Sequence, residues 1–369
     1  MYVEAEFRGL ALRLVPPYVH VFETHAKQRW WGRTVRDVYE QDFLAARDYD
    51  TLGAIRAGCI RVNGAPCAPE LVLVHGDVVT HPTHRHEPPT LHVRARDMVL
   101  FDDGDLLVVE KPPSVPIHAG GQYNRNSLVA IFQNELGLRL RPVHRLDRLV
   151  GGLVLFARTP ATAREMTSLL SHAPGDGCKV QKTYVARVQG RFAGAEGAWR
   201  ELSAPIAELD ARRGRMGVCF ATGKESLSRF ALLRYCAETD TSLVQCEPLT
   251  GRTHQLRLHL RHLGHPIPND PLYGPRAVAD AGEDDEEDAA YTRLVAGLAA
   301  PAPEGDPELA ALALRGCHLC PLPPRFPRSI EGIFLHSVRV RRFERGRKVF
   351  EYQGRLPRWA EGAALLDDE

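Results

Sequence analysis

The chain has 369 residues, of which 44% are hydrophobic and 25% charged, and its net charge at pH 7 is +1. This size and composition suit one large core and a smaller module, so we expect two domains and exclude fibrous and disordered classes. The eight cysteines are scattered, and residues 1–17 lack both a basic start and an uninterrupted apolar run. No apolar run approaches the roughly 20 residues of a membrane-spanning helix. We therefore expect reduced thiols, no membrane segment, and a location in the cytoplasm or, alternatively, in the nucleus or a mitochondrion.

Residues 1–92 are expected to form an N-terminal region that contains a small α/β module at about 34–80. The predicted elements are helices over 34–46 and 50–58, a strand over 59–62, an Asn63-Gly64 hairpin turn and a strand from residue 75. The segments 55–64 and 75–79 together resemble the second half of the small alpha-L RNA-binding module. The alternative interpretation is a generic helical cap followed by a hairpin.

Residues 80–92 combine two consecutive prolines with many polar residues and no hydrophobic period, which predicts a linker. Four histidines lie in this segment: His81, His84, His86 and His92. No carboxylate or thiol stands at a ligand-like spacing from them, so we expect no metal site there. Cys317 and Cys320 have the spacing of half a zinc site, but no second pair stands nearby in the sequence, and we expect unpaired thiols.

Residues 93–360 are expected to form the larger, catalytic domain. The predicted elements are two short strands around the Asp102-Asp103-Gly104 turn, helices over 127–137 and 159–172, and strands over 152–157, 183–190 and 242–250. Because these lack a regular βαβ alternation, we predict an α+β fold with a mixed, largely antiparallel sheet flanked by helices. Residues 276–328 are acidic, then Ala-rich, then Pro-rich, which indicates a surface insertion, and residues 361–369 are expected to be a tail.

One acid, Asp147, stands among cations just before an apolar stretch. Its neighbours in sequence are Arg141, His144, Arg145 and Arg148. Burial alone would raise the pKa of a carboxyl group in this setting and neutralise it, whereas an adjacent arginine favours the charged form. A charged, half-buried carboxylate can act as a nucleophile, a base or an electrostatic stabiliser. The alternative is a plain ion pair at the entrance to a strand.

Residues 251–262 carry three arginines, three histidines and no acid. In a helix, one face holds His254, Arg257 and Arg261, and another holds Leu256, Leu260 and Leu263. The cationic face, with Arg252 before it, suits delivery of a guanidinium to a carboxylate or to the phosphates of a polyanion. A solvated helix face is the alternative. Although the net charge argues against indiscriminate binding of polyanions, this local concentration permits a nucleic-acid footprint.

Several motifs in order resemble those of the RluA-type RNA pseudouridine synthases, and in particular the eukaryotic members. They are LLVVEKPPSVPIHAGG (106–121), HRLDRLVGGLVLFA (144–157), KTYVARVQG (182–190) and GRTHQLRLHLRHLGHPIPNDPLYG (251–274). The likeness spans about residues 98–274, and the later stretch 332–340 is also similar. A single HRLD sequence would be weak evidence, but several ordered motifs with compatible spacing are strong evidence.

The resemblance implies roles for individual residues. Asp147 matches the catalytic aspartate, Tyr184 the tyrosine that lies against the target uracil and is implicated in handling its C5 proton, and Arg257 the basic residue that pairs with the aspartate. Arg145 matches an arginine that can occupy the space vacated by the flipped nucleotide. Further RNA contacts are expected from Arg148, Arg252, His254 and Arg261. The chain departs from the family at Val150-Gly151, where Thr-Ser is usual, and we expect altered local hydrogen bonding there.

The sequence therefore predicts a pseudouridine synthase that acts as a monomer on structured RNA, with transfer RNA favoured over ribosomal RNA by the likeness to eukaryotic relatives. Uridine isomerisation requires the detached base to be held and water excluded, and it needs no cofactor or metal. The carboxylate can attack the sugar carbon or assist formation of a glycal. A non-catalytic RNA-binding protein on the same scaffold is the rival hypothesis, which the departure at Val150-Gly151 permits. A carboxylate glycosidase lacks a second acid at a readable spacing.

Overall fold

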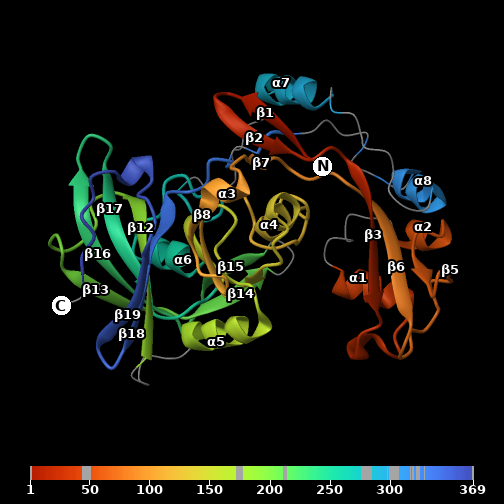
Figure 1. Ribbon diagram of the computed structural model, residues 1–369, viewed down its shortest axis with the longest axis horizontal. Coiled ribbons are helices and arrows are strands. Elements are labelled where there is room, and N and C mark those ends of the chain that lie inside the picture. Colours follow the sequence, from red (N-terminus) through yellow and green to blue (C-terminus); the bar gives the residue numbers. More distant parts are fainter. Residues whose placement is uncertain are drawn as a thin grey trace.

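The structure is a computed structural model. It describes residues 2–43, 51–171, 178–210, 214–275, 285–296, 298, 307–315, 317, 320, 325–327 and 329–367. Parts of the predicted insertion 276–328 and the end of the predicted tail therefore lie outside the described residues. Figure 1 shows a large curved sheet with its helices, an N-terminal group of elements beside it, and a small sheet above that connects the two. In the described part of the chain, no helix has the length and apolar character needed to cross a membrane.

The large sheet has ten strands. Its order is β13 (Trp199–Ser203), β16 (Leu227–Cys236), β17 (Thr241–Pro248), β12 (Cys178–Gln189), β18 (Leu335–Glu344), β11 (Gly151–Ala157), β9 (Leu106–Lys111) and β8 (Val99–Asp102), with β10 (Arg141–Pro142) beside β11 and β19 (Arg347–Gln353) beside β18. Among the described strand pairs of this sheet, only β11 with β18 is parallel. The prediction of an α+β fold with a mixed, largely antiparallel sheet is thus confirmed.

Helices pack on the inner face of this sheet and supply most of its core. They are α3 (Ala95–Met98), α4 (Leu128–Leu136) and α6 (Gln255–His262), whereas α5 (Pro160–Ser171) packs on the opposite face against Leu153 and Leu155 of β11. The predicted limits of α4 are confirmed, since the Ser127 hydroxyl accepts from the Ala130 N–H and Gly137 ends the helix with φ 70°. Leu128, Phe132 and Leu260 enter one core with side chains of β11 and β12. A hairpin of β14 (Ile206–Asp210) and β15 (Arg215–Val218) lies against α6.

Side chains of β12 divide between the two faces of the sheet. Tyr184, Ala186 and Val188 belong to the inner core, whereas Val185 packs on the outer face with Leu243 of β17 and with the C-terminal segment. The register of β12 against β18 shifts between Thr183 and Tyr184. The extra residue at this shift is Val338 of β18, so the side chains of β12 keep their regular alternation and Tyr184 stays on the inner face.

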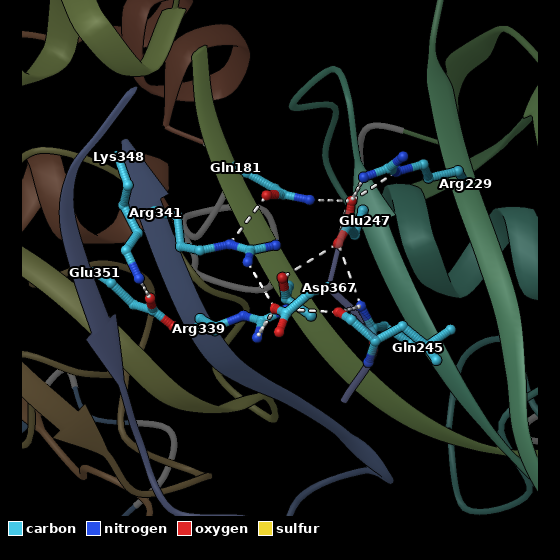
Figure 2. A network of polar contacts seen from close by, with 11 residues as sticks. Gln181, Arg229, Gln245, Glu247, Arg339, Arg341, Lys348, Glu351 and Asp367 are labelled. Atoms are coloured by element: carbon cyan, nitrogen blue, oxygen red, sulfur yellow. Dashed lines mark hydrogen bonds and ion pairs between the residues drawn. The ribbon is translucent and has the colours of Figure 1, made fainter. Parts of the chain in front are cut away.

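The outer face is covered by residues 354–367, which include η3 (Arg358–Ala360). Figure 2 shows the polar network beneath them, with Glu247 of β17 near its centre. Leu366 exchanges backbone hydrogen bonds with the Gln245 side chain, and Asp367 accepts from Arg339 and Arg341 at 2.8 Å each. The predicted tail is therefore attached to the sheet over its described length.

The N-terminal region forms two sheets. The first contains β1 (Val3–Phe7), β2 (Leu10–Leu14) and β7 (Thr90–Leu91), and the second contains β3 (Tyr18–His25), β6 (Val78–Arg85), β4 (Arg61–Val62) and β5 (Ala65–Pro66). The second sheet carries η1 (Gln28–Trp30), α1 (Val35–Asp42) and α2 (Thr51–Arg56) and has its own core. Asn63 and Gly64 both have positive φ, 53° and 78°, as the predicted hairpin turn requires. The predicted small α/β module thus corresponds to observed elements.

The prediction of a linker over 80–92 is wrong. Residues 78–85 form β6, which pairs with β3 along its length, and residues 90–91 form β7. The strand escaped detection because its partner stands about 60 positions earlier and its side chains lack a regular apolar alternation. Buried Glu87, between the two strands, accepts from the Tyr18 hydroxyl and from the backbone N–H groups of Arg125 and Asn126. This carboxylate joins the N-terminal region to the loop before α4.

The described parts of the predicted insertion pack on the N-terminal region. Tyr291 of α7 (Asp285–Ala296) lies against Phe7 and Phe326, over the β1–β2 sheet. Helix α8 (Pro307–Arg315) contacts β6 and β3. In Figure 1, α7 lies beside the small upper sheet of β1 and β2, and α8 lies beside β6. The insertion thus covers two N-terminal surfaces before the chain returns to β18.

Candidate active site

The candidate site is built around the loop between β10 and β11. Asp147 in this loop has a side chain that is 28% exposed, and its Oδ2 accepts from Nη1 of Arg257 at 2.9 Å. His254 Nε2 lies 3.8 Å from the same oxygen. Asp147, in the loop before β11, and Arg257, in α6, are 110 positions apart in the chain. The predicted pairing of Asp147 with Arg257 is present in the structure.

Arg257 is held from behind by a second acid. Its Nε and Nη2 donate to the two carboxylate oxygens of Asp270 at 2.6 and 2.8 Å, and the arginine side chain is 3% exposed. Burial alone would lower the pKa of Arg257, but the bonds to Asp270 and the charge of Asp147 raise it. Burial likewise acts to raise the pKa of Asp270, yet the Arg257 guanidinium holds it below its ordinary value. A fixed, charged guanidinium therefore presents its remaining edge to Asp147.

Asp270 was missed by sequence reasoning. It also accepts from the backbone N–H groups of Leu272 and Tyr273, at 2.9 and 3.0 Å, so its oxygens are fully engaged. The residue lies within the motif 251–274, where a lone acid after the arginine-rich helix was the one available signal. Since it is bonded to Arg257, it fixes the guanidinium and is not free to act as a second acid toward a substrate.

Lys111, at the end of β9, is hydrogen-bonded to the loop that carries Asp147. It is fully buried, and its Nζ donates to the carbonyl oxygens of Pro112, Val115 and Arg148 at 2.9–3.0 Å. Burial lowers the pKa of Lys111 to about 7, and the charge of Asp147 acts in the opposite direction. Three carbonyl acceptors match the three N–H bonds of an ammonium group. The lysine thus ties the carbonyl next to Asp147 to the loop after β9, a role that sequence reasoning missed.

Tyr184 on β12 is buried at the same site. It stands between Cys246 of β17 and Ser337 of β18 in the sheet. Burial raises the pKa of its hydroxyl most, and the negative charge of Asp147 raises it further, while Ser337 acts in the opposite direction. Tyr184 and Leu256 of α6, the residue before Arg257, belong to the same core. Tyr184 is therefore protonated at neutral pH, with Asp147 and Arg257 nearby.

Comparisons with known proteins identify the family of this chain. The profile of the family described as RNA pseudouridylate synthase matches residues 105–262. In Saccharomyces cerevisiae, the tRNA pseudouridine(31) synthase is 33% identical over 298 residues, which cover 71% of this chain and 72% of the relative. The chain belongs to the RluA-type RNA pseudouridine synthase family.

Two further members are similar to this chain. The mitochondrial tRNA pseudouridine(32) synthase of S. cerevisiae is 35% identical, over 71% of this chain and 55% of the relative. The solved structure titled human RNA Pseudouridylate Synthase Domain Containing 1 has a TM-score of 0.43 and 23% identity, and covers 70% of this chain and 83% of that one. The chain spans between 47% and 65% of the length of three curated relatives.

The departure from the family at Val150-Gly151 has a local explanation. Val150 is buried in the core, and its N–H donates to the backbone oxygen of Asp147 at 3.0 Å. A Cβ on Gly151 would stand 2.8 Å from Nδ1 of His336. In this chain, the His336 imidazole therefore occupies the space that a serine side chain at position 151 would need. Gly152 has φ +108°, and a Cβ there would lie 2.1 Å from the backbone oxygen of Ser337. The backbone of β18, close against the start of β11, therefore holds this end of the loop that carries Asp147.

The expectation that neighbouring cations in the sequence hold Asp147 is wrong. Arg141 donates to the backbone oxygen of Arg158, and half-buried His144 accepts from the Leu155 N–H. Among the described residues, neither Arg145, which is exposed, nor Arg148 forms an ion pair with the acid. Because alternate positions of a tight loop point in different directions, adjacency in sequence does not bring these side chains to the carboxylate.

The residue pattern of α6 predicts one packed apolar face and one cationic face, but residues on both faces are buried in the structure. Arg257 and Leu256 are both buried, whereas Arg261 is exposed, so the predicted cationic face is divided between the protein interior and solvent. Arg252 is exposed, and its Nε donates to the Glu225 backbone oxygen at 3.0 Å. His254, at the N-cap with φ 58°, lies 2.7 Å from the Tyr273 hydroxyl, and burial lowers its pKa. Of the four cationic candidates here, Arg257 and His254 face Asp147.

A cluster of side chains that could bind a metal ion lies apart from the Asp147 site. Among the described residues, His84, His86, Cys317 and Cys320 form a cluster of potential ligands. The premise that the histidine segment and the cysteine pair each lack a partner is therefore wrong. The two motifs complete one another, because α8 delivers the cysteines to the end of β6.

Proposed function

We propose that this chain is an RNA pseudouridine synthase, an isomerase that converts a uridine in structured RNA to pseudouridine with Asp147 as the catalytic carboxylate. The observation that carries the proposal is the Asp147–Arg257–Asp270 arrangement. The guanidinium is held by the buried Asp270 and bonded to the half-exposed Asp147 at 2.9 Å. A charged carboxylate that is ordered by protein and still open to solvent is suited to attack or stabilise an electron-poor sugar carbon. Membership of the family supports the same reaction.

Tyr184 provides the surface for the detached base in this proposal. Uridine isomerisation breaks the bond from N1 to the ribose, turns the uracil, and joins it through C5, so the free base must be held in place between the two steps. An aromatic ring beside Asp147 can stack on the uracil. Because burial and the charge of Asp147 raise the pKa of the hydroxyl, the residue takes part as a neutral phenol that handles the C5 proton by hydrogen bonding.

Exposed arginines around the site are the proposed RNA contacts. Extracting a base from its stack costs a few kcal/mol, least in loops, and phosphate contacts must offset that cost. Arg145 is exposed next to the catalytic loop, where it can fill the space of the flipped nucleotide. Arg148 lies 5.4 Å from the centre of the Tyr123 ring. Arg252, His254 and Arg261 extend the same cationic region along α6.

Transfer RNA is the proposed substrate, since two relatives are named as tRNA pseudouridine synthases. We propose a monomer that acts in the cytoplasm without a cofactor. The N-terminal module, with its resemblance to the alpha-L fold, would add RNA contacts at a distance from the target uridine. The rival function, RNA binding without catalysis, rests on the departure at Val150-Gly151 and is distinguished by the experiment below.

The decisive experiment measures tritium release from RNA labelled at C5 of uridine. Separate reactions contain transfer RNA and ribosomal RNA, and single-turnover conditions separate chemistry from binding. The unmodified protein should release tritium from transfer RNA, and Asp147→Asn should slow release by at least about a thousandfold because the neutral amide is neither nucleophile nor base. Affinity for the RNA, measured by fluorescence anisotropy, should change less than about twofold.

The matched control is Asp105→Asn, which removes an exposed acid from the β8–β9 turn and should leave turnover unchanged. Binding without release from any RNA would establish the non-catalytic alternative. Release that survives in Asp147→Asn would show that another residue performs the chemistry. Release from ribosomal RNA alone would overturn the proposed substrate while leaving the reaction intact.

A further inference from the structure

We propose that His84, His86, Cys317 and Cys320 bind one zinc ion that fastens the N-terminal module to the segment preceding β18. The two histidines lie at the end of β6 and just after it, and the cysteines follow α8. One ligand atom from each residue lies within 4.8 Å of those of all the others. Cys320 and His86 are 234 positions apart in the chain, so the fold brings them together.

The distances within the cluster fit a tetrahedral ion. His84 Nδ1 lies 3.1 Å from Cys320 Sγ, while His86 Nε2 lies 3.4 Å from Cys317 Sγ and 3.5 Å from Cys320 Sγ. The two ring nitrogens are 3.1 Å apart. Zinc bonds of about 2.3 Å to sulfur and about 2.05 Å to nitrogen give a regular tetrahedron with N···S near 3.5–3.6 Å and N···N near 3.3–3.4 Å. Small outward shifts of the four groups would therefore complete the geometry.

The local chain geometry on each side favours chelation. Cysteines separated by two residues are the usual chelating pair of structural zinc sites. His84 and His86 are two positions apart in extended backbone, so both side chains project to the same side. Their rings are perpendicular, with centres 4.7 Å apart, and each aims a different nitrogen at the sulfur atoms. Two thiolates with two imidazoles form a ligand set that selects zinc over harder cations.

Hydrogen bonding alone explains the cluster poorly. Thiols are weak donors and weak acceptors, and two imidazoles gain little from facing them. Once both thiols are deprotonated, a dication neutralises them and accepts all four lone pairs. Because the protein supplies every ligand, the coordination shell is closed, as in structural zinc sites, and leaves no position for a reacting water.

The position of the cluster indicates what the ion would stabilise. Figure 1 shows α8 beside β6, on the side of the N-terminal module that faces away from the large sheet. Helix α8 packs on β3 and β6, and the chain then returns to β18 next to the candidate active site. Glu87 already bonds the N-terminal region to the loop before α4. Zinc would add a second connection, between β6 of the module and the segment that leads from α8 to β18. The module would then be held in one orientation relative to the Asp147 loop.

The experiment measures zinc in the full chain, expressed without a metal-affinity tag and purified without added metal. Elemental analysis should give close to one zinc per chain for the unmodified protein and close to none for Cys317→Ser/Cys320→Ser. The control, Cys219→Ser/Cys236→Ser, removes two partly exposed thiols elsewhere and should retain the ion. Zinc retained by the first variant, or absent from the unmodified protein even after incubation with zinc, would overturn the proposal.

A second measurement remains informative if the double variant fails to fold. Unmodified protein stripped of metal and loaded with Co²⁺ should show intense visible bands of a tetrahedral ion and a thiolate charge-transfer band, and one equivalent of Zn²⁺ should remove both. Chelation should increase hydrogen exchange in β6 and α8 but not in β12 or β17. A Cys317–Cys320 disulfide found by mass spectrometry of the purified protein, or a cobalt spectrum without thiolate bands, would overturn the site. These readouts involve no RNA, so they are independent of the proposed reaction.

Discussion

The two faces of the large sheet each hold a carboxylate bonded to arginine, and the two ion pairs differ in how completely they are satisfied. On the outer face, Glu247 is 1% exposed and accepts from Arg229 and Gln181 at one oxygen and from Thr183 and Gln245 at the other. On the inner side, Asp147 is 28% exposed and bonded through one oxygen to Arg257. Within the described residues, its Oδ1 makes no hydrogen bond.

This difference separates a structural ion pair from a reactive one. Glu247 is saturated, and its partner Gln245 is bonded to Leu366 of the C-terminal segment, whose Asp367 is seen beside the network in Figure 2, so the charge of Glu247 can stabilise only the sheet. Asp147 receives its counter-ion from an arginine that a third residue, Asp270, already holds in place. The other oxygen of Asp147 is left without a protein donor among the described residues, and the side chain is partly exposed. A charged group with one engaged and one unengaged oxygen is expected of a functional site, because a purely structural pair gains stability from saturation.

Among the residues that support the two faces, the largest effect is expected from removing the acid behind the reactive pair. Asp270→Asn replaces one oxygen that accepts from Arg257 with an amide that can only donate. The buried guanidinium loses its orientation and part of its neutralisation, so the free energy of unfolding should fall by about 3–5 kcal/mol. Turnover per folded molecule should fall about a hundredfold because Arg257 no longer fixes Asp147. Denaturant titration and single-turnover tritium release measure the two quantities.

RNA affinity supplies the control for Asp270→Asn. If the acid acts through Arg257, binding should stay within about twofold, since no phosphate contact is removed. Equal losses in affinity and turnover would show that the variant disturbs the RNA surface, and the positioning role assigned to Asp270 would fail.

The outer-face acid should behave in the opposite way. Glu247→Gln removes the charge that Arg229 pairs with and brings an amide N–H toward the donors Gln181 and Gln245. We expect a loss of about 3 kcal/mol in the free energy of unfolding and turnover per folded molecule within about twofold of the unmodified protein. Differential scanning calorimetry and the tritium assay at a temperature where the variant is folded test both. A large loss of turnover in folded protein would remove the distinction between the two faces.

Acid titration provides a smaller effect of known sign. Arg257 outweighs burial and holds the pKa of Asp270 below its ordinary value of 3.8. A lowered carboxyl pKa contributes stability that is present above the unfolded value and is lost as the pH falls through the folded value. The unmodified protein should therefore lose stability below about pH 4, and Asp270→Asn should lose less in that interval. Denaturant midpoints from pH 6 to 2.5 check this, and parallel curves for the two proteins would contradict it.

Local pattern predicted the elements that carry their own signals. The Asp102-Asp103-Gly104 turn between β8 and β9, the limits of α4 and the apolar strand β11 follow from turn residues, caps and hydrophobicity. By contrast, β6 satisfies its backbone through β3, a partner that no local pattern reveals. The same reason explains why the cluster of His84 and Cys320 was read as two unrelated fragments.

The candidate site shows the same division. Ordered motifs identified Asp147, Tyr184 and Arg257, but the supporting contacts depend on three-dimensional position. Lys111 serves three carbonyl groups that sequence cannot place, and Asp270 is one acid among many until α6 folds against it. Neighbours in sequence were also misleading, since Arg145 and Arg148 adjoin Asp147 without pairing with it. Sequence identified the reacting groups, and the fold supplies the residues that hold them.

The smallest expected effect lies at the edge of the outer network. Asp367 accepts from the buried Arg339 and Arg341, but its own side chain is 71% exposed, so water screens both contacts. Asp367→Asn should reduce the free energy of unfolding by no more than about 1 kcal/mol and leave tritium release unchanged. The two hydrogen bonds between the Leu366 backbone and the Gln245 side chain should keep the C-terminal segment attached, which hydrogen exchange of the Leu366 N–H would verify. A loss as large as that of Glu247→Gln would mean that the outer network depends on its exposed end, and that saturation around Glu247 does not explain its stability.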